Sequence, residues 1–350
     1  MDDFAKLPAA ERKPYFETAS ANDGRMGEHI IEKDFWVCWT LKRLFVMKSL
    51  DGHLIFKGGT SLSKVFKVIE RFSEDIDLSV SRELLGFSGD KAPEKAKSAK
   101  KRDQGIEDLS NACREFVLKK LHPELKRTIK ATLGSPKDWK LEIDSSDGDG
   151  QTLLFEYPAA SKPAGGYVVP VVKIEMGARS DHWPAHQHVV RPYLAEQVTG
   201  VLVAPDTLVK TLDASRTFWE KATILHSFAH YPDTKTPAAR QSRHYYDLFK
   251  LLQTKHPGEA VADLGLLARV AEHKSVYFRA GWAKYEEAKR GTLKLMPGER
   301  LAGIMKRDYE QMQEMIFDVA HTWEDILAAI EEFETKFNSA YLTQNLTSCS

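Results

Sequence analysis

The sequence contains few cysteines, no long apolar run and no net charge. Its 3 cysteines, Cys38, Cys113 and Cys349, show no CxxC spacing and are too sparse for a disulfide scaffold, which favours a reducing compartment. No run of about 18 apolar residues occurs and the N-terminus has no apolar signal core, so we expect a cytoplasmic protein without a membrane span. Lys and Arg, 50 in all, balance 50 Asp and Glu. This balance excludes a globally basic binder of nucleic acid or lipid, and any such binding must use a local patch.

The spacing of apolar residues predicts an α+β front part and an all-helical back part. We expect helices over 8–50, and then strands at 53–57, 76–80, 139–143, 152–157 and 167–176, with a helix from about 106 to 125. Later helices are expected over 206–228, 238–252, 261–280, 299–319 and 323–337. The predicted domains are N-terminal helices over 1–50, an α+β domain over 51–204 with a mobile basic insertion at about 81–105, and a helical domain over 205–350.

A double glycine after a short strand is the first half of the strongest local signal. Gly58 and Gly59 let the backbone approach a phosphate closely, since glycine accepts strained conformations. Thr60 or Ser61 can cap a helix that runs to Ile69. The free N–H groups of that helix would face the anion.

Two aspartates form the second half of the signal. Asp75 and Asp77 lie on one face of a predicted strand, whereas Ile76 turns into the core. Adjacent carboxylates repel unless a cation lies between them, and hard oxygen ligands suit Mg²⁺ or Mn²⁺, which would also bridge the phosphates of a nucleoside triphosphate (NTP). The order strand, GG[ST], helix, DxD strand is that of the polymerase-β-like nucleotidyltransferase fold, a mixed sheet with helices.

The sequence also resembles a known family, the AbiEii/AbiGii toxins of bacterial nucleotidyltransferases. The stretch FKGGTSLSKVFKVIERFSEDIDLSV is similar to that family's first motif. Further similar stretches are IIEKDFWVCWTLKRLF, VVKIEMGARS, TFWEKATILH, RHYYDLFKLL and KRDYEQMQEMIF. The resemblance covers about residues 25 to 340, with 81 to 135 the least distinctive part.

The resemblance implies roles for residues at matching positions. Asp75 and Asp77 match the metal-binding pair, and Gly58, Gly59, Thr60 and Ser61 match the phosphate-binding turn. Glu175 matches a third carboxylate that helps to hold the metal or to activate the acceptor hydroxyl. Strand alternation puts Lys173 on the same face as Glu175, which suits a charged cleft, although an exposed edge strand would have the same pattern.

Basic residues of the later motifs are implied to bind the nucleotide. Lys221 matches the family lysine that binds the triphosphate; without the resemblance, it would be one half of a solvated helix pair with Glu220. Arg243 and Asp247 match the family's RDxxD motif, in which His244 here replaces the first aspartate. Asp247 is expected to orient Lys221 or Arg243.

Other polar residues near these motifs have simpler interpretations. Arg179 follows the Glu175 strand and is expected to reach a phosphate. Ser73, two residues before Asp75, is a hypothetical modification site that would place negative charge beside the carboxylates. The histidines of DHWPAHQH, namely His182, His186 and His188, have no cysteine partners, so a surface loop is favoured over a zinc site. Likewise, the aromatic residues of FWVCWTLKRLF are expected to pack on the sheet.

These motifs lead to one main hypothesis and two alternatives. The main hypothesis is a metal-dependent nucleotidyltransferase that transfers a nucleoside monophosphate (NMP) from an NTP to an acceptor hydroxyl. The resemblance implies a toxin with a separately encoded antitoxin, and an RNA acceptor, commonly the tRNA 3′ end in studied relatives. The alternatives are NMP transfer to a protein hydroxyl and an inactive module that binds nucleotide or RNA.

The zero net charge is the sum of basic and acidic segments. Residues 91–130 carry twelve Lys and Arg against six acids, and 205–256 carry eight against five, whereas 299–335 carry three against ten. We therefore expect the 91–130 stretch, with Lys95, Lys97, Lys100, Lys101 and Arg102, to meet RNA phosphates.

Overall fold

The computed structural model describes residues 1–73, 75–161, 169–317, 319 and 321–347, with side chains up to residue 339. Tyr167, Val168 and Cys349 lie outside the described residues, so the start of the strand expected at 167 is not tested. The chain forms two compact units, Met1–Val65 with Phe72–Leu212, and Phe66–Arg71 with Asp213–Ser350. The α+β fold class is confirmed. None of the helices in the described part of the chain is long and apolar enough to cross a membrane.

The first unit is built around a sheet of seven strands in its described residues. The strands are β1 (Leu54–Lys57), β2 (Asp75–Val80), β3 (Lys140–Ile143), β4 (Thr152–Glu156), β5 (Val171–Gly177), β6 (Ala185–Val190) and β7 (Thr207–Leu212). Their order is β3-β4-β5-β2-β1-β7-β6. β2 and β5 are parallel, as are β1 and β7, whereas the other neighbours are antiparallel. β5 is thus an interior strand, which excludes the edge-strand interpretation of Lys173 and Glu175.

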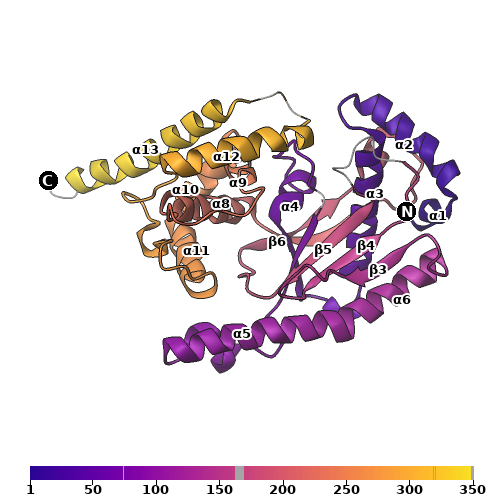
Figure 1. Ribbon diagram of the computed structural model, residues 1–350, viewed down its shortest axis with the longest axis horizontal. Helices are drawn as coiled ribbons and strands as arrows, with labels where there is room; N and C mark the ends of the chain where they lie inside the picture. Colours follow the sequence, from indigo (N-terminus) through magenta and orange to yellow (C-terminus); the bar gives the residue numbers. More distant parts are fainter. Residues whose placement is uncertain (74, 162–168, 318, 320, 348–350) are drawn as a thin grey trace. The chain divides into compact units, whose positions relative to one another are not determined.

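Helices cover this sheet and extend beyond it (Figure 1). They are α1 (Asp2–Lys6), α2 (Ala9–Asp23), α3 (Glu28–Phe45), α4 (Gly58–Lys64), α5 (Ala99–Phe116), α6 (His122–Leu133) and α7 (Tyr193–Gln197). α3 packs against β2, β5 and β7. Its Trp36 and Trp39 are fully buried, and Trp39 stacks on Phe155 of β4 with ring centroids 5.7 Å apart. The predicted packing of the aromatic helix on the sheet is confirmed, and each such side chain contributes roughly 1.5–3 kcal/mol by burial.

α5, a π-helical turn (Val117–Leu121) and α6 form one long rod along the sheet unit (Figure 1). Its buried residues recur every four positions, at Leu109, Cys113, Val117, Leu121, Leu125 and Ile129. A strict four-residue repeat drifts around an α-helix of 3.6 residues per turn, and the wider π-turn compensates for part of that drift. The expectation of an irregular segment up to residue 105 is wrong from Ala99 onward. There the Ser98 hydroxyl caps α5 by accepting a hydrogen bond from the Lys101 N–H at 3.3 Å.

Three other predictions need correction. The helix after the double glycine ends at Lys64 rather than Ile69. The helix expected over 206–228 is wrong in its first part, where β7 alternates buried Thr207, Val209 and Thr211 with more exposed residues. Of the histidine segment expected as a loop, Ala185 to His188 belong to β6, which pairs with β7 at the edge of the sheet, whereas His182 lies in the loop before β6. The predicted boundary at 204 thus precedes β7, whereas the compact units divide after Leu212.

The second unit is helical in its described residues. Its helices are α8 (Ala214–Ala229), α9 (Arg243–Leu252), α10 (His256–Ala262), α11 (Leu264–Tyr277), α12 (Glu299–Met312) and α13 (Trp323–Thr347). α8 packs against α9, α10 and α11, and Trp219 and Tyr245 are fully buried in this core. The short segment Phe66–Arg71, which connects α4 to β2 along the chain, belongs to this unit. Within the helical unit, the Phe317 N–H donates to the carbonyl of Glu70 in this segment at 3.0 Å.

Candidate active site

The acidic residues predicted from the sequence meet on two neighbouring strands of the first unit. In the parallel pair β2 and β5, Asp75 lies opposite Lys173 and Asp77 lies opposite Glu175. The residues between them, Ile76 and Ile174, are fully buried, so the four charged side chains share the other face of the sheet. The structure therefore brings Glu175 next to the aspartate pair.

Gly58 holds the glycine turn against Asp77. Its φ of +78° lies in the left-handed region that glycine adopts without strain. A Cβ atom at this position would overlap the carboxylate of Asp77. Only a glycine therefore allows the turn to approach Asp77 this closely.

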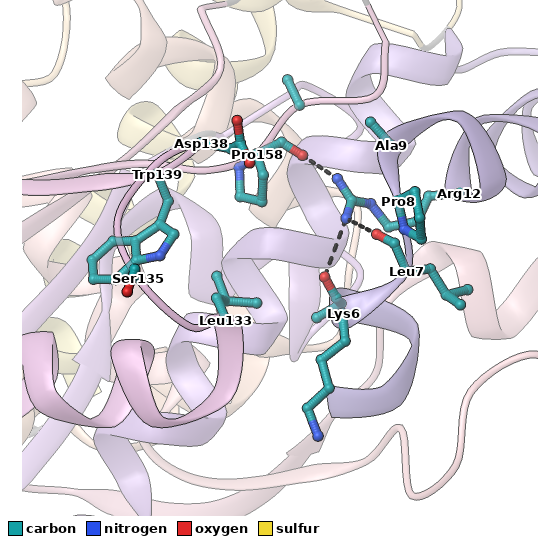
Figure 2. Close-up of a pocket in the computed structure, with 12 residues that line it drawn as sticks. Lys6, Leu7, Pro8, Ala9, Arg12, Leu133, Ser135, Asp138, Trp139 and Pro158 are labelled. Carbon is teal, nitrogen blue, oxygen red and sulfur yellow. Dashed lines mark hydrogen bonds between the residues drawn. The ribbon is translucent and has the colours of Figure 1, made fainter.

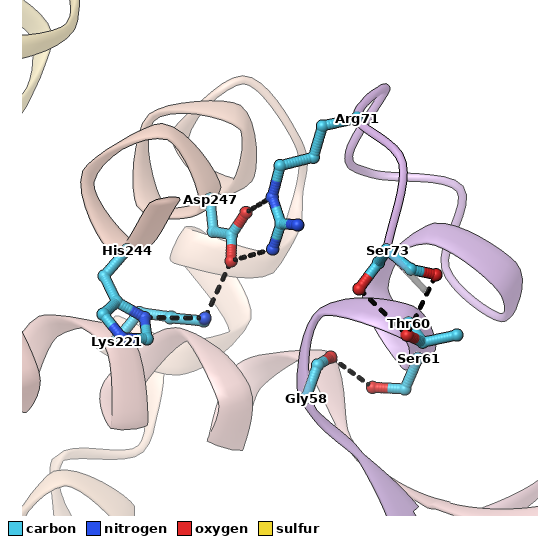
Figure 3. A network of polar contacts seen from close by, with 8 residues as sticks. All are labelled: Gly58, Thr60, Ser61, Arg71, Ser73, Lys221, His244 and Asp247. Atoms are coloured by element: carbon cyan, nitrogen blue, oxygen red, sulfur yellow. Dashed lines mark hydrogen bonds and ion pairs between the residues drawn. The ribbon is translucent and has the colours of Figure 1, made fainter. Parts of the chain in front are cut away.

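The hydroxyls of Thr60 and Ser61 have internal partners, as Figure 3 shows. The Thr60 Oγ1 donates to the Asp75 carbonyl and lies 2.9 Å from the Ser73 Oγ, and the Ser61 Oγ donates to the Gly58 carbonyl at 2.8 Å. The prediction that Thr60 or Ser61 caps the helix is wrong, because α4 already begins at Gly58 and its N-cap residue makes no side-chain cap. Thr60 instead fixes the entry to β2, where Ser73 is half-buried.

The pairing of the strands places two lysines on this face, because Lys173 of β5 lies opposite Asp75 and Lys57 of β1 lies opposite Asp77. Lys173 forms an ion pair with one of the acids. Its Nζ lies 2.6 Å from the Glu175 Oε1, and both side chains are 37% exposed. Burial lowers the pKa of Lys173, but Glu175, Asp75 and Asp144 attract the ammonium strongly enough that the pKa is raised. A cavity of about 270 Å³ opens beside this pair and is lined also by Asp144, in the loop between β3 and β4.

The donor set fits a divalent metal in its chemistry and register, because carboxylate oxygens on neighbouring strands suit Mg²⁺ or Mn²⁺. As they stand, however, no three Asp, Glu, His or Cys side chains converge to hold a metal among the described residues.

A second group of predicted residues lies within the helical unit, and Figure 3 shows its contacts. The Lys221 Nζ donates to the Asp247 Oδ2 at 2.7 Å and to the His244 Nδ1 at 3.0 Å. Arg71 donates to both oxygens of Asp247, at 2.8 and 3.0 Å. Lys221 and Asp247 are buried. Asp247 thus contacts Lys221, as its expected orienting role requires, and Arg71 is a partner that we did not predict.

The charges in this group shift its pKa values. Burial alone would raise the pKa of Asp247, but Arg71 and Lys221 hold it well below its usual range. Burial and the charge of Arg71 lower the pKa of Lys221 against the opposing effect of Asp247. Burial, Lys221 and Arg243 lower the pKa of His244 well below 6.5. Since an ammonium only donates, the His244 Nδ1 is the acceptor and the imidazole is neutral.

Arg179 and His182 contact residues that are not among the predicted ones, although Asp149, the partner of Arg179, also lines the cavity beside Lys173 and Glu175. Arg179 contacts Asp149 at 3.3 Å, in the loop between β3 and β4. The His182 Nε2 lies 2.8 Å from the Ser79 Oγ of β2, whereas His186 and His188 lie on β6. A larger cavity of about 470 Å³ contains none of the predicted site residues. Figure 2 shows that its Arg12 is already held by backbone carbonyls, with distances of 3.1 and 2.6 Å to the oxygens of Ala5 and Leu7.

Comparison with known families identifies the chain. A family model described as the nucleotidyl transferase AbiEii toxin of type IV toxin–antitoxin systems matches residues 39–338. The chain belongs to the AbiEii family. It is thus a nucleotidyltransferase toxin by family, for which an NTP substrate, a divalent metal and a separate antitoxin are usual.

Solved structures and curated sequences add little to the AbiEii assignment. MenT4, a nucleotidyltransferase toxin from Mycobacterium tuberculosis H37Rv, is 18% identical, with a TM-score of 0.44 over 93% of this chain and 97% of that one. JHP933 from Helicobacter pylori is 11% identical, with a TM-score of 0.41 over 92% and 99% of the two chains. A search of curated proteins found no match.

The site residues missed at the sequence level are Arg71 and Asp144. Arg71 lies inside the first AbiEii-like stretch, four residues before Asp75, yet nothing in its spacing points to Asp247, 176 positions later. Asp144 follows β3 in an Asp-rich and Gly-rich turn, DSSDGDG, which we had not considered. This turn was the signal in the sequence from which Asp144 could have been identified.

Proposed function

We propose that this AbiEii-family protein transfers an NMP from an NTP to a hydroxyl of RNA, at the tRNA 3′ end, in a divalent-metal-dependent reaction. The observation that carries the proposal is the register of β2 and β5, in which Asp77 lies opposite Glu175 and Gly58 packs against Asp77. Carboxylates beside a glycine turn combine a cation site with a place for phosphates. Asp75, Asp77 and Glu175 would hold the metal, whose chemistry is to neutralise charge on the triphosphate.

In this proposal the remaining chemistry belongs to side chains of the protein. Glu175 would either complete the metal site or act as the base that accepts the proton of the acceptor hydroxyl, as the hydroxyl oxygen bonds to the α-phosphorus. The bond from the α-phosphorus to the bridging oxygen breaks, and pyrophosphate leaves. Lys221 and Arg243 are proposed to neutralise that leaving group, while Asp247 orients Lys221. Gly58, Gly59, Thr60 and Ser61 form the turn that faces the phosphates.

The proposal is tested with one labelling assay. Wild-type protein is incubated with each of the four labelled NTPs in turn, total tRNA and Mg²⁺, and the Asp75→Ala variant is run beside it. We expect transfer by the wild type, no transfer by Asp75→Ala, and relief of any growth arrest by that variant. Asp90→Ala, which removes an exposed aspartate elsewhere in the same unit, is the control and should keep activity. An Asp75→Ala protein that still arrests growth would contradict the mechanism.

The same assay identifies the acceptor. Digestion of the labelled product with RNase or with protease separates RNA from protein as the acceptor. Label that survives RNase and is released by protease would favour transfer to a protein hydroxyl. Metal-dependent NTP binding without any transfer would instead favour an inactive binding module. Co-expression with its separately encoded antitoxin should abolish the growth arrest if the protein is the toxin of such a pair.

A further inference from the structure

We propose that Lys173 is the internal counter-ion of the acidic site and competes with the divalent metal for Glu175. This inference rests on the proposed function only in taking Asp75, Asp77 and Glu175 as the metal ligands. It assigns to Lys173 a positioning role: the ammonium holds the third carboxylate until a metal displaces it.

The position of Lys173 is set by the sheet and does not depend on a long flexible reach. Lys173 and Glu175 are two residues apart on β5, so both project from the same face of the strand. Lys173 lies opposite Asp75 on β2, and Glu175 lies opposite Asp77. An ammonium at this position therefore faces carboxylates both on its own strand and on the neighbouring one.

The charges around Lys173 are mostly negative. From β2 it faces Asp75, from β5 it contacts Glu175 at 2.6 Å, and Asp144 of the loop after β3 also attracts it. Of the side chains that line the adjoining cavity, within the described part of the chain, Lys173 is the cation. Lys57 of β1, opposite Asp77, is a second lysine on this face. Asp75, Asp77, Glu175 and Asp144 still outnumber the two lysines, and this charge arrangement favours a further positive charge.

Metal binding at this site changes the partner of Glu175. The Glu175 Oε1 is less available to a divalent ion while it accepts from the Lys173 Nζ. The ammonium also repels a 2+ ion at the neighbouring carboxylates. Both effects weaken metal binding, so removing the charge of Lys173 strengthens it.

The test measures metal binding directly, without a catalytic readout. Full-length protein without nucleotide is titrated with Mn²⁺, and free Mn²⁺ is followed by electron paramagnetic resonance. For Lys173→Met we expect Kd for Mn²⁺ to fall about three- to tenfold, because a charge repulsion across a few ångströms of partly solvated space is lost. Lys173→Arg keeps the charge and should remain close to the wild type.

The matched control is Lys140→Met. Lys140 pairs with Glu156 at 3.7 Å across β3 and β4. The variant therefore removes an exposed Lys–Glu ion pair of the same sheet, away from the acidic site. Its Kd for Mn²⁺ should equal that of the wild type. Asp75→Ala should lose the Mn²⁺ binding, which assigns the titration to this site.

The outcomes separate this inference from the proposed function. Tighter Mn²⁺ binding by Lys173→Met, but not by Lys173→Arg or Lys140→Met, supports the role of Lys173, whether or not NMP transfer is observed. Unchanged or weaker binding by Lys173→Met, with normal binding by the wild type, overturns the role of Lys173 and leaves the metal site in place. If neither protein binds Mn²⁺, both the inference and the proposed metal site are wrong.

Discussion

Arg71 donates two hydrogen bonds to the carboxylate of Asp247, one from Nε at 2.8 Å and one from Nη2 at 3.0 Å. Both side chains are almost completely buried, with 4% and 0% exposed. Arg71 belongs to the short segment that joins α4 to β2 along the chain, whereas Asp247 lies on α9. This bidentate pair therefore anchors that connection in the helical unit.

Asp247→Asn should destabilise the protein by roughly 3–5 kcal/mol, because it leaves the buried charges of Arg71 and Lys221 without their partner. Urea unfolding followed by circular dichroism measures the effect. Asp206→Asn is the matched control, since Asp206 also accepts two hydrogen bonds from one arginine, Arg191, at 2.6 and 2.8 Å, but in an exposed position. That variant should lose no more than about 1 kcal/mol. Equal losses in the two variants would contradict the anchoring role.

Gly58→Ala should abolish NMP transfer, because the added methyl group would displace the carboxylate of Asp77 in addition to straining the backbone. Gly52→Ala isolates the strain. Gly52 has a similar φ of +74°, but an added Cβ there meets nothing within 4 Å. We expect each substitution to cost about 1 kcal/mol of stability from backbone strain, and activity to fall only in Gly58→Ala. The measurements are thermal unfolding and the NTP labelling assay. Loss of activity in both variants would show that strain alone is responsible.

Stability should decline below about pH 6.5 through His244. Its pKa is lowered in the folded protein, so only the unfolded state takes up the proton as the pH falls through the ordinary value. The contribution of His244 to the free energy of unfolding is complete above pH 6.5. It is lost as the pH falls below this value, by up to about 1.4 kcal/mol per pH unit. Free energies of unfolding from pH 7.5 to 5.0 for the wild type and His244→Gln measure it. A flatter profile is expected for the variant, and parallel profiles would contradict the prediction.

Local features of this fold were readable from the sequence, whereas distant partners were not. The β1–α4–β2 unit with Gly58, Asp75 and Asp77 follows from turn chemistry and strand alternation over a short stretch. The start of α5 was readable too, because Ser98 is a standard N-cap residue, but the high charge of the segment suggested disorder. β7 was mistaken for helix because its alternation spans six residues beside a long helical pattern.

The site's electrostatics depended on tertiary register. Asp77 lies opposite Glu175 only when β2 and β5 pair in parallel in one register. A shift of that register by one residue would turn every side chain of the shifted strand to the other face of the sheet. The family resemblance supplied Glu175 as a candidate, but the ion pair with Lys173 and the approach of Asp144 come only from the folded arrangement. Likewise, Arg71 could not be assigned to Asp247, because their contact spans 176 positions.

A row of exposed cations lies on the rod of α5 and α6, and we propose that it meets the phosphates of an RNA acceptor. It consists of Lys119, Lys120, Lys126, Arg127 and Lys130, on the side of the helix opposite its buried stripe. The row spans about 16 Å at 1.5 Å per residue, a length over which one strand of a DNA-like double helix presents about five phosphates. No large apolar side chain is exposed between residues 47 and 142, all of which the structure describes except residue 74. An apolar-centred protein interface is therefore not favoured here.

Replacing Lys126, Arg127 and Lys130 together by alanine should raise Kd for total tRNA about tenfold or more at physiological salt. Each lost phosphate contact should also reduce the slope of log Kd against log salt concentration by about 0.7–0.9. The matched control replaces Lys289, Lys294 and Arg307, exposed cations of the helical unit, by alanine and should bind like the wild type. Fluorescence anisotropy of labelled tRNA measures both quantities. A poly-glutamate peptide serves as a second anionic probe, and a variant that loses the peptide but keeps tRNA would assign this face to an acidic protein partner instead of RNA.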